Sequence, residues 1–530
     1  MTSTLPSQLD VLVVGSGAAG LISALAAQHA GRSVAVIEKA DKLGGTTSAG
    51  GGVIWAPNNA IGKAAGYSDS YEQAIDYIRE ATGGALSTEQ MDWYVQTIGA
   101  AVDFLQSETQ ISFMAIARPD YHMEFAGATQ GGRSLDNSAF DFSSYPGLAE
   151  RLRPATYFPL LTMVERDELN GRAPDATLLA QRKESGVRTM GGALLGALAA
   201  SAINRGIPML ESTGMTDLVK TNDGWQVTLS TGDSITARSV IIASGGFEWN
   251  QTLQDSFLTR SVTPISAPSN EGDGLVAALK VGASVKDMHA VWGVPVITPT
   301  EMNYDGKQSG RMGNVEMTLP GSITVNAAGR RFVNEALNYH DANRAFSAVD
   351  PNTGRLANDP TWLIFDNTFM NSYPVAGSTP GTPASWMHQA DTLEELASTI
   401  GVDAAGLLDE VALFNRDAEV GVDTRFGRGS TPQDRFLGDA THSPNPCLRP
   451  LADGPFFAVR MHSGVLGTSG GIQVDEHSRV LDQSGNPLDG LYAAGNVAAG
   501  VFRNTYPGGG ATLGSAVARA YAAGVHAGTR

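Results

Sequence analysis

The chain contains a single cysteine, Cys447, among its 530 residues. One thiol cannot form an internal disulfide framework, and it cannot supply the clustered cysteines that bind zinc or an iron–sulfur centre. The sequence therefore predicts no metal site. Such scarcity of cysteine is typical of a reducing compartment, so we expect a cytoplasmic location.

Positive charge is also scarce, with 36 Lys and Arg against 54 Asp and Glu and a formal net charge of −18. Such a chain repels nucleic acids and anionic membrane surfaces, so neither is expected as a partner. No apolar run reaches transmembrane length, and residues 1–9 lack the basic start and apolar core of a signal peptide. We expect a soluble protein without a transmembrane segment, long enough for two domains.

Glycine, in contrast, is abundant at 62 residues. Gly15, Gly17 and Gly20 have GxGxxG spacing; they follow an apolar strand over 11–14 and open a helix over 18–30. In dinucleotide-binding folds the first glycine permits a tight turn, the second lets the backbone approach a pyrophosphate, and the third lets helix and strand pack closely. The N-terminus of the helix then faces the phosphates with free N–H groups.

A second strand, over 33–37, ends in Glu38, where a carboxylate accepts hydrogen bonds from a ribose diol. Strand, turn, helix, strand and acid all occur in order, so the first forty residues predict a bound dinucleotide. The predicted contacts in this part are Gly15, Ser16, Gly17, Ala18, Ala19, Gly20, Glu38 and Lys39.

The segment over 42–55 is rich in Gly, Thr and Ser, which offer backbone and hydroxyl donors along an extended ligand. It resembles FAD-dependent oxidoreductases of the fumarate reductase and 3-ketosteroid dehydrogenase group. The resemblance implies that this segment lies along FAD. It also implies noncovalent binding, because residues 44–48 contain no histidine, whereas related complexes carry a linking histidine at this place. The implied contacts are Gly44, Gly45, Thr46, Thr47, Ser48, Gly51 and Gly52.

Apolar residues at three- and four-residue spacing predict helices over 71–82 and 88–107, the second with Ser87 as its N-cap. Residues 114–190 are predicted to be irregular, and their Gly, Pro, Arg and aromatic content favours a functional loop. A helix over 190–203 follows.

Later segments resemble further cofactor-contacting elements of the same group: 238–247, 270–274, 486–496 and 505–514. The last of them opens a helix over 515–527, and its N–H groups are expected at the electron-rich edge of the flavin ring. The contacts implied here are Ala243, Ser244, Gly245, Gly274, Gly495, Asn496, Gly510, Ala511, Thr512 and Leu513.

The composition shifts between about 290 and 450, where proline is more frequent and glycine less clustered. We therefore expect an α/β fold in which a Rossmann-like FAD-binding domain carries an inserted α+β substrate (cap) domain. The expected ranges are 1–290 for the first part of the FAD-binding domain, 291–450 for the cap domain and 451–530 for the return segment.

Together with residues 329–335, these motifs resemble the 3-ketosteroid dehydrogenases from end to end. The resemblance implies desaturation of a cyclic ketone beside its carbonyl, namely 1,2-dehydrogenation of a 3-ketosteroid, with electrons passed to an acceptor that the sequence does not identify. A smaller cyclic ketone of the cyclohexanone type is an alternative, because Gly509 stands where the family commonly has proline, which leaves that backbone less constrained.

Such chemistry needs a base for the α-proton, donors for the enolate oxygen, and a β-carbon about 3–3.5 Å from flavin N5. The resemblance places Tyr339 as the base, Tyr121 as a supporting tyrosine, and Tyr506 with the N–H of Gly510 at the enolate oxygen. A tyrosine acts as a base only if its neighbours lower its pKa from about 10. Tyr157 could replace Tyr121.

Two other functions remain open from the sequence. A fumarate-reductase-like enzyme would clamp a dicarboxylate with cationic side chains, for which His462, Arg503 and Arg260 are available. A module that binds flavin without catalysis is disfavoured, because it needs no enclosed substrate space and so no large cap region.

Overall fold

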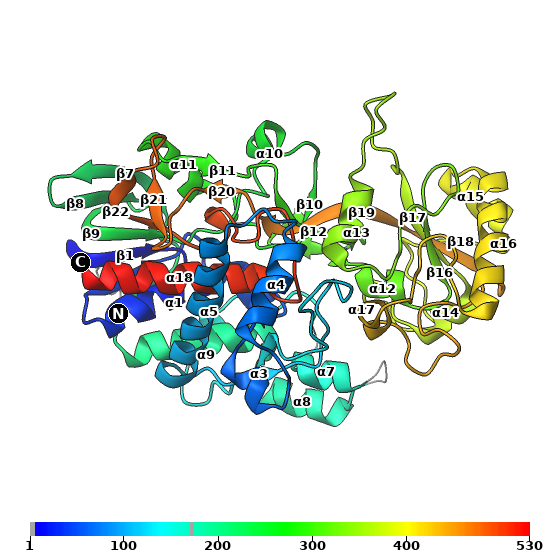
Figure 1. The fold of residues 1–530 in the computed structure, drawn as a ribbon, viewed down its shortest axis with the longest axis horizontal. Helices are drawn as coiled ribbons and strands as arrows, with labels where there is room; N and C mark the ends of the chain where they lie inside the picture. Colours follow the sequence, from blue (N-terminus) through cyan, green and yellow to red (C-terminus); the bar gives the residue numbers. More distant parts are fainter. Residues whose placement is uncertain (1–5, 159, 170–173) are drawn as a thin grey trace. The chain divides into compact units, whose positions relative to one another are not determined.

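The computed structural model describes residues 6–158, 160–169 and 174–530, and the chain forms two compact units (Figure 1). Unit 1 comprises Met1–Thr259, Ser266–Trp292 and Gly467–Arg530, and unit 2 comprises Arg260–Ile265 and Gly293–Leu466.

The main sheet of unit 1 is mostly parallel and runs in the order β21-β22-β9-β1-β2-β6, with a hairpin of β7 and β8 attached to β9. Val11 to Val14 of β1 are buried, because a central parallel strand is covered on both faces. The strands of this sheet are β1 (Gln8–Val14), β2 (Val34–Ile37), β6 (Met209–Leu210), β7 (Met215–Thr221), β8 (Gly224–Leu229), β9 (Ser234–Ile242), β21 (Arg479–Leu481) and β22 (Pro487–Ala493).

Helix α18 (Ala511–Thr529) lies beside α1 (Ala18–His29), so the two ends of the chain meet in unit 1 (Figure 1). Small residues allow this close approach: a Cβ at Gly524 would lie 2.5 Å from the carbonyl oxygen of Ser23. The Ser23 hydroxyl also donates to the carbonyl oxygen of Ala520 at 3.0 Å. The predicted last helix is therefore present and begins four residues earlier, at the Gly-rich turn.

The predicted helices over 71–82 and 88–107 are confirmed as α4 (Tyr71–Ala81) and α5 (Thr88–Glu108). Ser87 is the N-cap of α5 and forms a capping box with Gln90. The other helices and short strands of unit 1 are α2 (Gly45–Ala49), β3 (Ile54–Trp55), α3 (Ala60–Ala64), β4 (Phe113–Ala115), β5 (Ser134–Asn137), α9 (Met190–Asn204), α10 (Gln251–Phe257), α11 (Asp273–Lys280), β11 (Val285–Lys286), β20 (Gly471–Ile472) and the 3₁₀ turn η1 (Gly495–Val497).

Residues 114–190 are less irregular than predicted. They contain β5 and three short helices, α6 (Leu148–Arg151), α7 (Met163–Glu168) and α8 (Ala176–Glu184). The helices α7 and α8 begin at side-chain caps, Thr162 with Glu165 and Asp175 respectively, which favour helix locally in a region whose composition is typical of a loop.

Unit 2 contains a mixed sheet in the order β15-β12-β19-β17-β16, to which β10 and β18 add through β19. Residues 451–466, assigned from the sequence to the return segment, lie in unit 2 because β19 pairs along β17. The strands are β10 (Thr263–Pro264), β12 (Val291–Ile297), β13 (Asn303–Tyr304), β14 (Lys307–Gln308), β15 (Arg311–Met312), β16 (Ser322–Val325), β17 (Thr361–Phe365), β18 (His388–Ala390) and β19 (Phe456–Thr468).

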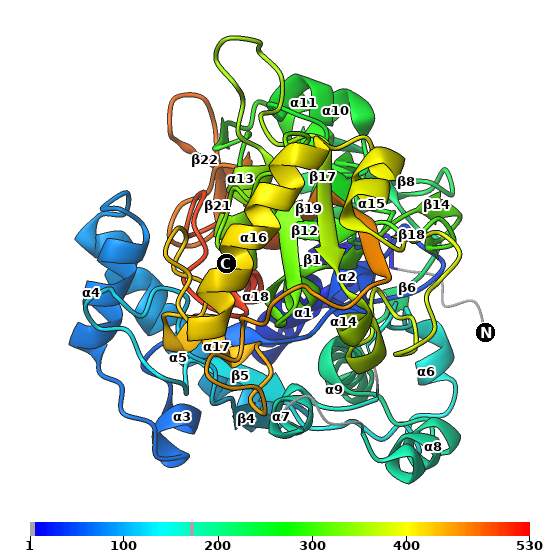
Figure 2. The same cartoon turned by 90° about the vertical axis from the view of Figure 1, so that its right-hand side faces the viewer.

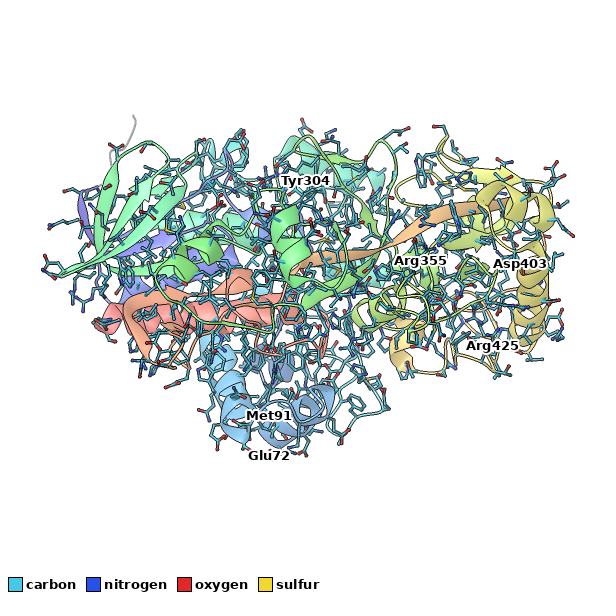
Figure 3. The ribbon with its side chains drawn as sticks, turned by 90° about the horizontal axis from the view of Figure 1, so that it is seen from above. Glu72, Met91, Tyr304, Arg355, Asp403 and Arg425 are labelled. Atoms are coloured by element: carbon cyan, nitrogen blue, oxygen red, sulfur yellow. The ribbon has the colours of Figure 1, made fainter. Side chains whose placement is uncertain are left out.

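Helices α15 (Leu393–Ile400) and α16 (Ala404–Val420) cover one face of this sheet, where Leu396 and Phe414 join a core with Ile364 (Figure 2). Asp403 caps the start of α16, and Arg425, just after its end, pairs with Glu410 at 2.6 Å (Figure 3). The remaining helices of unit 2 are α12 (Asn314–Thr318), α13 (Tyr339–Phe346), α14 (Asn367–Ser372) and α17 (Pro432–Phe436).

No helix in the described ranges is both long enough and apolar enough to span a bilayer.

Candidate active site

The GxGxxG turn is built so that two of its glycines are required by packing and one is left open. A Cβ at Gly15 would lie 2.3 Å from the carbonyl oxygen of Ala243, and one at Gly20 would lie 1.9 Å from that of Gly15. Gly17, the N-cap of α1, would make only an ordinary contact of 3.7 Å with Thr47 Oγ1. The packed glycines thus fix the turn, and the open one leaves the backbone accessible to a phosphate.

Glu38 at the end of β2 is buried and bound to Ser16. Its Oε2 accepts hydrogen bonds from the N–H of Ser16 at 3.1 Å and from its hydroxyl at 2.6 Å. Ser16 Oγ in turn accepts from the N–H of Gly44 at 2.9 Å. This hydrogen bond joins the GxGxxG turn to the segment over 44–52. Glu38 therefore orders the turn, and a contact with ribose stays a prediction.

Lys39, the next predicted contact, reaches towards α11. Its Nζ lies 2.8 Å from Glu271 and 2.6 Å from Asp273. Burial opposes the charge of Lys39, but the two carboxylates prevail and raise its pKa.

The hydroxyls of the segment over 44–52 hold neighbouring loops in place. Thr47 Oγ1 accepts from the N–H of Ala18 at 3.2 Å, and the Ser48 hydroxyl donates to a carbonyl oxygen at 2.6 Å. Gly44, Gly45 and Gly52 have positive φ, and a Cβ at Gly52 would lie 2.5 Å from a backbone nitrogen of α9. The segment, which contains α2, thus packs its backbone closely against α9, while a Cβ at Gly51 would contact only a methionine side chain, at 3.1 Å.

We call the GxGxxG turn, the segment over 44–52 and the glycine turns that pack beside them the cradle. A third segment of the cradle follows β9, after Ala243. A Cβ at Gly274 would lie 2.2 Å from Ser244 Oγ, and one at Gly245 would lie 2.4 Å from Asn270 Oδ1. The Ser244 hydroxyl oxygen is buried and has no hydrogen-bond partner among the described residues. Because buried hydroxyls normally have a hydrogen-bond partner, the unpartnered Ser244 hydroxyl fits a polar ligand bound in this cradle.

Glu248, which the sequence did not single out, ties these segments together. Its fully buried carboxylate accepts from the Ser266 hydroxyl at 2.6 Å, from Asn270 Nδ2 at 2.8 Å and from the N–H of Thr468 at 3.2 Å. Asn270 Nδ2 also donates to Thr46 Oγ1 at 3.0 Å. Burial raises the pKa of Glu248. A single acid after a glycine pair has no recognisable pattern, so sequence alone could not find it.

The C-terminal turn completes the cradle. Gly510, the N-cap of α18, has a φ of 99°, and a Cβ there would lie 2.7 Å from the carbonyl oxygen of Val53. Ala511, Thr512 and Leu513 form the first turn of α18, whose N-terminus carries the positive end of the helix dipole. Gly495 also has positive φ, and Asn496 Oδ1 accepts from the Trp292 indole at 3.1 Å.

Two of the predicted catalytic tyrosines lie together in unit 1. The rings of Tyr121 and Tyr506 stack with centroids 5.7 Å apart, and the N–H of Tyr121 donates to the carbonyl oxygen of Pro507 at 3.1 Å. The Thr512 hydroxyl donates to the Tyr506 hydroxyl at 3.1 Å. The ring of Trp292 meets Tyr506 edge-on at 5.5 Å. The structure thus brings Tyr121, Tyr506 and the turn at Gly510 into one site.

A buried ion-pair network holds the loop that carries Tyr121. Asp120 accepts from Arg133 at 2.8 Å and from the Trp55 indole at 3.0 Å, and Arg133 also binds Asp69 at 2.6 Å. Burial raises the pKa of Asp120, and the adjacent guanidinium of Arg133 opposes that rise. These residues fix the backbone of Tyr121 without being part of any sequence motif.

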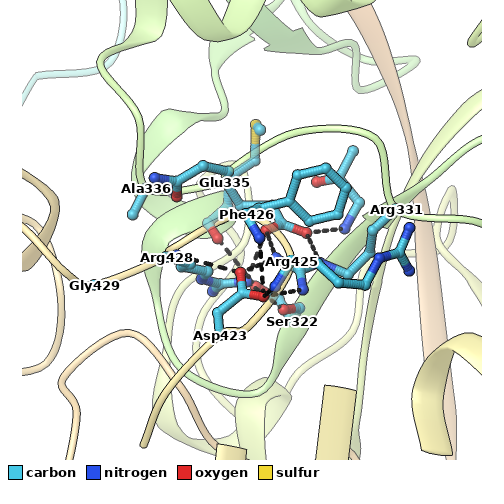
Figure 4. A network of polar contacts seen from close by, with 12 residues as sticks. Ser322, Arg331, Glu335, Ala336, Asp423, Arg425, Phe426, Arg428 and Gly429 are labelled. Atoms are coloured by element: carbon cyan, nitrogen blue, oxygen red, sulfur yellow. Dashed lines mark hydrogen bonds and ion pairs between the residues drawn. The ribbon is translucent and has the colours of Figure 1, made fainter. Parts of the chain in front are cut away.

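Tyr339 lies in unit 2 as the first residue of α13 and is half-buried. The preceding motif is fixed by a buried charge network in which Arg331 contacts Glu335 at 2.5 Å and Asp423 at 2.8 Å (Figure 4). Arg428 lies 3.5 Å from Glu335 in the same network. The motif therefore sets the start of α13, and the role of Tyr339 as a base stays a prediction.

The residues of the dicarboxylate alternative are placed differently. Arg503, in unit 1, is bound to Asp287 at 3.0 and 2.8 Å, so its charge is already matched. In unit 2, burial and the charge of Arg460 lower the pKa of His462, and burial lowers the pKa of Arg260. Each shift disfavours the cationic form that a carboxylate clamp requires.

Tyr157, the alternative to Tyr121, lies in unit 1 before α7. Its ring contacts Phe158, with centroids 4.7 Å apart. Within the described part of the chain, no group of three or more His, Cys, Asp or Glu side chains is arranged to hold a metal.

The glycine cradle, the helix N-termini and the parallel sheet define a dinucleotide-binding flavoprotein site. The model of the FAD binding domain family matches residues 10–513. The chain is 37% identical over 539 residues to 4-oxocyclohexanecarboxylate 2-dehydrogenase of Sinomonas cyclohexanicum, covering 99% of this chain and 93% of the relative. It is 35% identical over 560 residues to 3-oxosteroid 1-dehydrogenase of Mycobacterium tuberculosis, covering 98% of both.

Among solved structures, 3-ketosteroid Δ1-dehydrogenase from Sterolibacterium denitrificans, in complex with 1,4-androstadiene-3,17-dione, aligns with a TM-score of 0.92 at 33% identity, covering 99% of this chain and 100% of that one. The chain therefore belongs to the FAD-binding flavoprotein family of these dehydrogenases. It is an FAD-dependent oxidoreductase that acts on CH–CH groups. The predicted α/β fold and the predicted cofactor FAD are confirmed.

Proposed function

We propose that this protein desaturates a ring ketone at the carbon–carbon bond beside its carbonyl. The observation that carries the proposal is the Tyr121–Tyr506 pair next to the turn that opens α18. A phenol and a helix N-terminus in one place suit the stabilisation of a developing enolate oxygen. FAD, when bound, supplies the two-electron oxidant that accepts a hydride from the β-carbon.

Tyr506 and the N–H of Gly510 are proposed as the donors to the enolate oxygen. The Thr512 hydroxyl donates to Tyr506, so the phenol oxygen already acts as an acceptor and its own O–H is directed to another group. This relay also makes the phenol a stronger donor, because hydrogen bonds in a chain polarise one another. Tyr121 supports the ring of Tyr506 by stacking.

Tyr339 is proposed as the base that removes the α-proton, on the resemblance of its place after the motif over 329–335. FAD would be held by the fingerprint at Gly15 to Gly20, the segment over 44–52, the turns at Ser244 and Gly274, and the first turn of α18. These residues fit the cofactor because their glycines leave the backbone exposed and Ser244 offers an unused buried hydroxyl.

Two classes of ring ketone agree with this proposal, a 3-ketosteroid and a smaller cyclohexanone-type ketone. Identities of 35% and 37% to relatives named for the two classes do not separate them. The test is anaerobic bleaching of the flavin by a 3-keto-4-ene steroid, by cyclohexanone, by 4-oxocyclohexanecarboxylate and by succinate, each offered alone. Bleaching by any of the ketones supports the proposal and identifies the class. Bleaching by succinate alone would overturn it and restore the dicarboxylate alternative.

A further inference from the structure

Helix α4 supports the loop that carries Tyr121. A Cβ at Gly127 would lie 2.1 Å from the carbonyl oxygen of Gln73, so the backbones of the loop and of the helix are in direct contact. About one helical turn further along α4, the Tyr77 hydroxyl accepts a hydrogen bond from the N–H of His122 at 3.2 Å. The loop is therefore attached to α4 at the residue that follows Tyr121.

The same hydroxyl also reaches the turn that follows Tyr506. It donates to the carbonyl oxygen of Pro507, which also accepts from the N–H of Tyr121 at 3.1 Å. A carbonyl oxygen has two lone pairs, so these two donors satisfy it fully. Tyr77 thus joins the residue that follows Tyr121 to the residue that follows Tyr506, and it fixes the backbones of both members of the stacked pair.

Tyr77 itself is held firmly. It is fully buried, with its ring centroid 6.1 Å from that of Trp55 and 5.2 Å from the guanidinium carbon of Arg133. The same two residues bind Asp120 in the ion-pair network of the loop. Burial and the negative charge of Asp120 raise the pKa of Tyr77 well above its usual value, so the hydroxyl keeps its proton and stays a donor.

Tyr94 is a second buried tyrosine of the same chemistry and allows a comparison. It is also fully buried, and its hydroxyl donates to the carbonyl oxygen of Trp55 at 2.7 Å. That carbonyl belongs to β3 and lies outside the turn that follows Tyr506. Each hydroxyl satisfies one buried carbonyl, but of the two it is Tyr77 that bridges the segments carrying the tyrosine pair.

We infer that Tyr77 is a positioning residue, which holds Tyr121 and Tyr506 in the arrangement that stabilises the enolate oxygen. The inference rests on the proposed ring-ketone function. A donor stabilises a developing charge best when it is fixed in advance, and a displacement of about 1 Å can cost about 100-fold in rate. Removal of the Tyr77 hydroxyl takes one donor from the Pro507 carbonyl and takes from the His122 N–H its acceptor, so the two segments lose their bridge.

The first experiment is a double-mutant cycle of Tyr77→Phe with Tyr506→Phe, measured with a ring ketone that bleaches the flavin. The phenylalanine keeps the ring packed against Trp55 and removes only the hydroxyl. We expect Tyr77→Phe to lower kcat by about 10-fold and to change KM by less than about threefold, because ground-state binding is unaffected. In the Tyr506→Phe background the same substitution should cost at most about twofold, since the donor that it positions is already absent.

Tyr94→Phe is the matched control, because it removes a buried hydroxyl that also donates to a backbone carbonyl. It should keep the wild-type kcat. A loss of kcat in Tyr77→Phe that is equally large with and without the Tyr506 hydroxyl would overturn the inference, because it would show a general effect on the fold.

Hydrogen–deuterium exchange of the holoenzyme tests the arrangement without turnover. Tyr77→Phe should speed amide exchange over both 120–123 and 506–510, whereas Tyr94→Phe should leave these two segments at the wild-type rate. Unchanged exchange over both segments in Tyr77→Phe would overturn the inference and leave the proposed function standing. A failure of every ring ketone to bleach the flavin would instead remove the proposed function and, with it, the role of Tyr77 in that reaction.

Discussion

At the scale of single residues, tyrosine hydroxyl groups of the same chemistry lie in different surroundings. Tyr506 receives a hydrogen bond from Thr512 and lies at the N-terminus of a long helix, whereas Tyr94 donates to the carbonyl oxygen of Trp55 and only supports the fold. Position relative to a helix end, more than residue type, marks the tyrosine that can stabilise a negative charge.

Tyr506→Phe should therefore reduce kcat/KM for the ring ketone by about 100- to 1,000-fold, because the proposed donor to the enolate oxygen is lost. FAD affinity should stay at the wild-type value. Tyr521→Phe, at a half-exposed tyrosine packed on Phe104, is the control and should keep both quantities. Equal activity of Tyr506→Phe and the wild type would remove Tyr506 from the mechanism.

Tyr339→Phe tests the proposed base. The phenylalanine keeps the ring at the start of α13 but has no oxygen to accept the α-proton, so turnover should collapse while the flavin spectrum and FAD affinity persist. The exchange of the substrate α-proton with solvent deuterium separates this role from a purely structural one, because a lost base stops exchange. Undiminished exchange in Tyr339→Phe would contradict the assignment.

Asp136 gives a prediction about pH. Burial raises its pKa from 3.8 to about 6, so the folded state holds this proton more tightly than the unfolded state. The stabilisation is present at low pH and is lost as pH rises from about 4 to about 6, and it amounts to about 3 kcal/mol. The unfolding free energy of Asp136→Asn relative to the wild type should rise by that amount between pH 4 and pH 7 in urea titrations. A constant difference across this range would contradict the raised pKa of this buried carboxyl.

At the scale of elements, the sequence predicts helices and strands that have a clear apolar pattern, and it misses those that depend on contacts with distant residues. Helices α4 and α5 follow apolar periodicity, the strand at 11–14 is a short apolar run and α9 is rich in small residues, so these elements and their approximate bounds were predictable. Helices α7 and α8 were missed, because caps and tertiary contacts override a composition rich in loop-forming residues.

The same limit applies to the site. Glycine spacing predicted the cradle, because glycine is required wherever a Cβ would strike the backbone. Glu248 and the pair of Asp120 with Arg133 could not be predicted, since each joins segments that are far apart in the sequence. The stacking of Tyr121 on Tyr506 likewise joins residues 385 positions apart and carries no local pattern.

The charge network before α13 is a test at this scale. Glu335 is fully buried and faces Arg331 and Arg428, so Glu335→Ala leaves two guanidinium groups without their shared carboxylate. We expect a loss of about 3–5 kcal/mol in unfolding free energy. Asp409→Ala, which removes an exposed partner of Arg330, should cost no more than about 1 kcal/mol. Similar losses in the two variants, measured by chemical denaturation, would show that the buried network does not stabilise this region.

At the scale of the whole molecule, unit 1 gathers the turns proposed to bind FAD from both ends of the chain and from its middle, so cofactor binding and folding should be thermodynamically linked. A ligand that binds only the folded state stabilises it by about 2.7 kcal/mol at a hundredfold excess over its Kd. The melting temperature of the apoprotein should therefore rise with FAD concentration.

A substitution at Gly17 tests FAD binding separately from the stability of the apoprotein. Its φ is −65° and a Cβ there would make only an ordinary contact, so Gly17→Ala should leave the melting temperature of the apoprotein unchanged. In the proposed site the pyrophosphate approaches the backbone at Gly17, where the added methyl group would lie, so FAD affinity should fall at least about tenfold and the FAD-induced rise in melting temperature should shrink with it. Gly99→Ala, in α5 with open space around its Cβ, should slightly stabilise the apoprotein and leave the FAD-induced rise intact. If Gly17→Ala binds FAD as tightly as Gly99→Ala does, the backbone at Gly17 does not meet the cofactor, and the phosphates must lie elsewhere in unit 1.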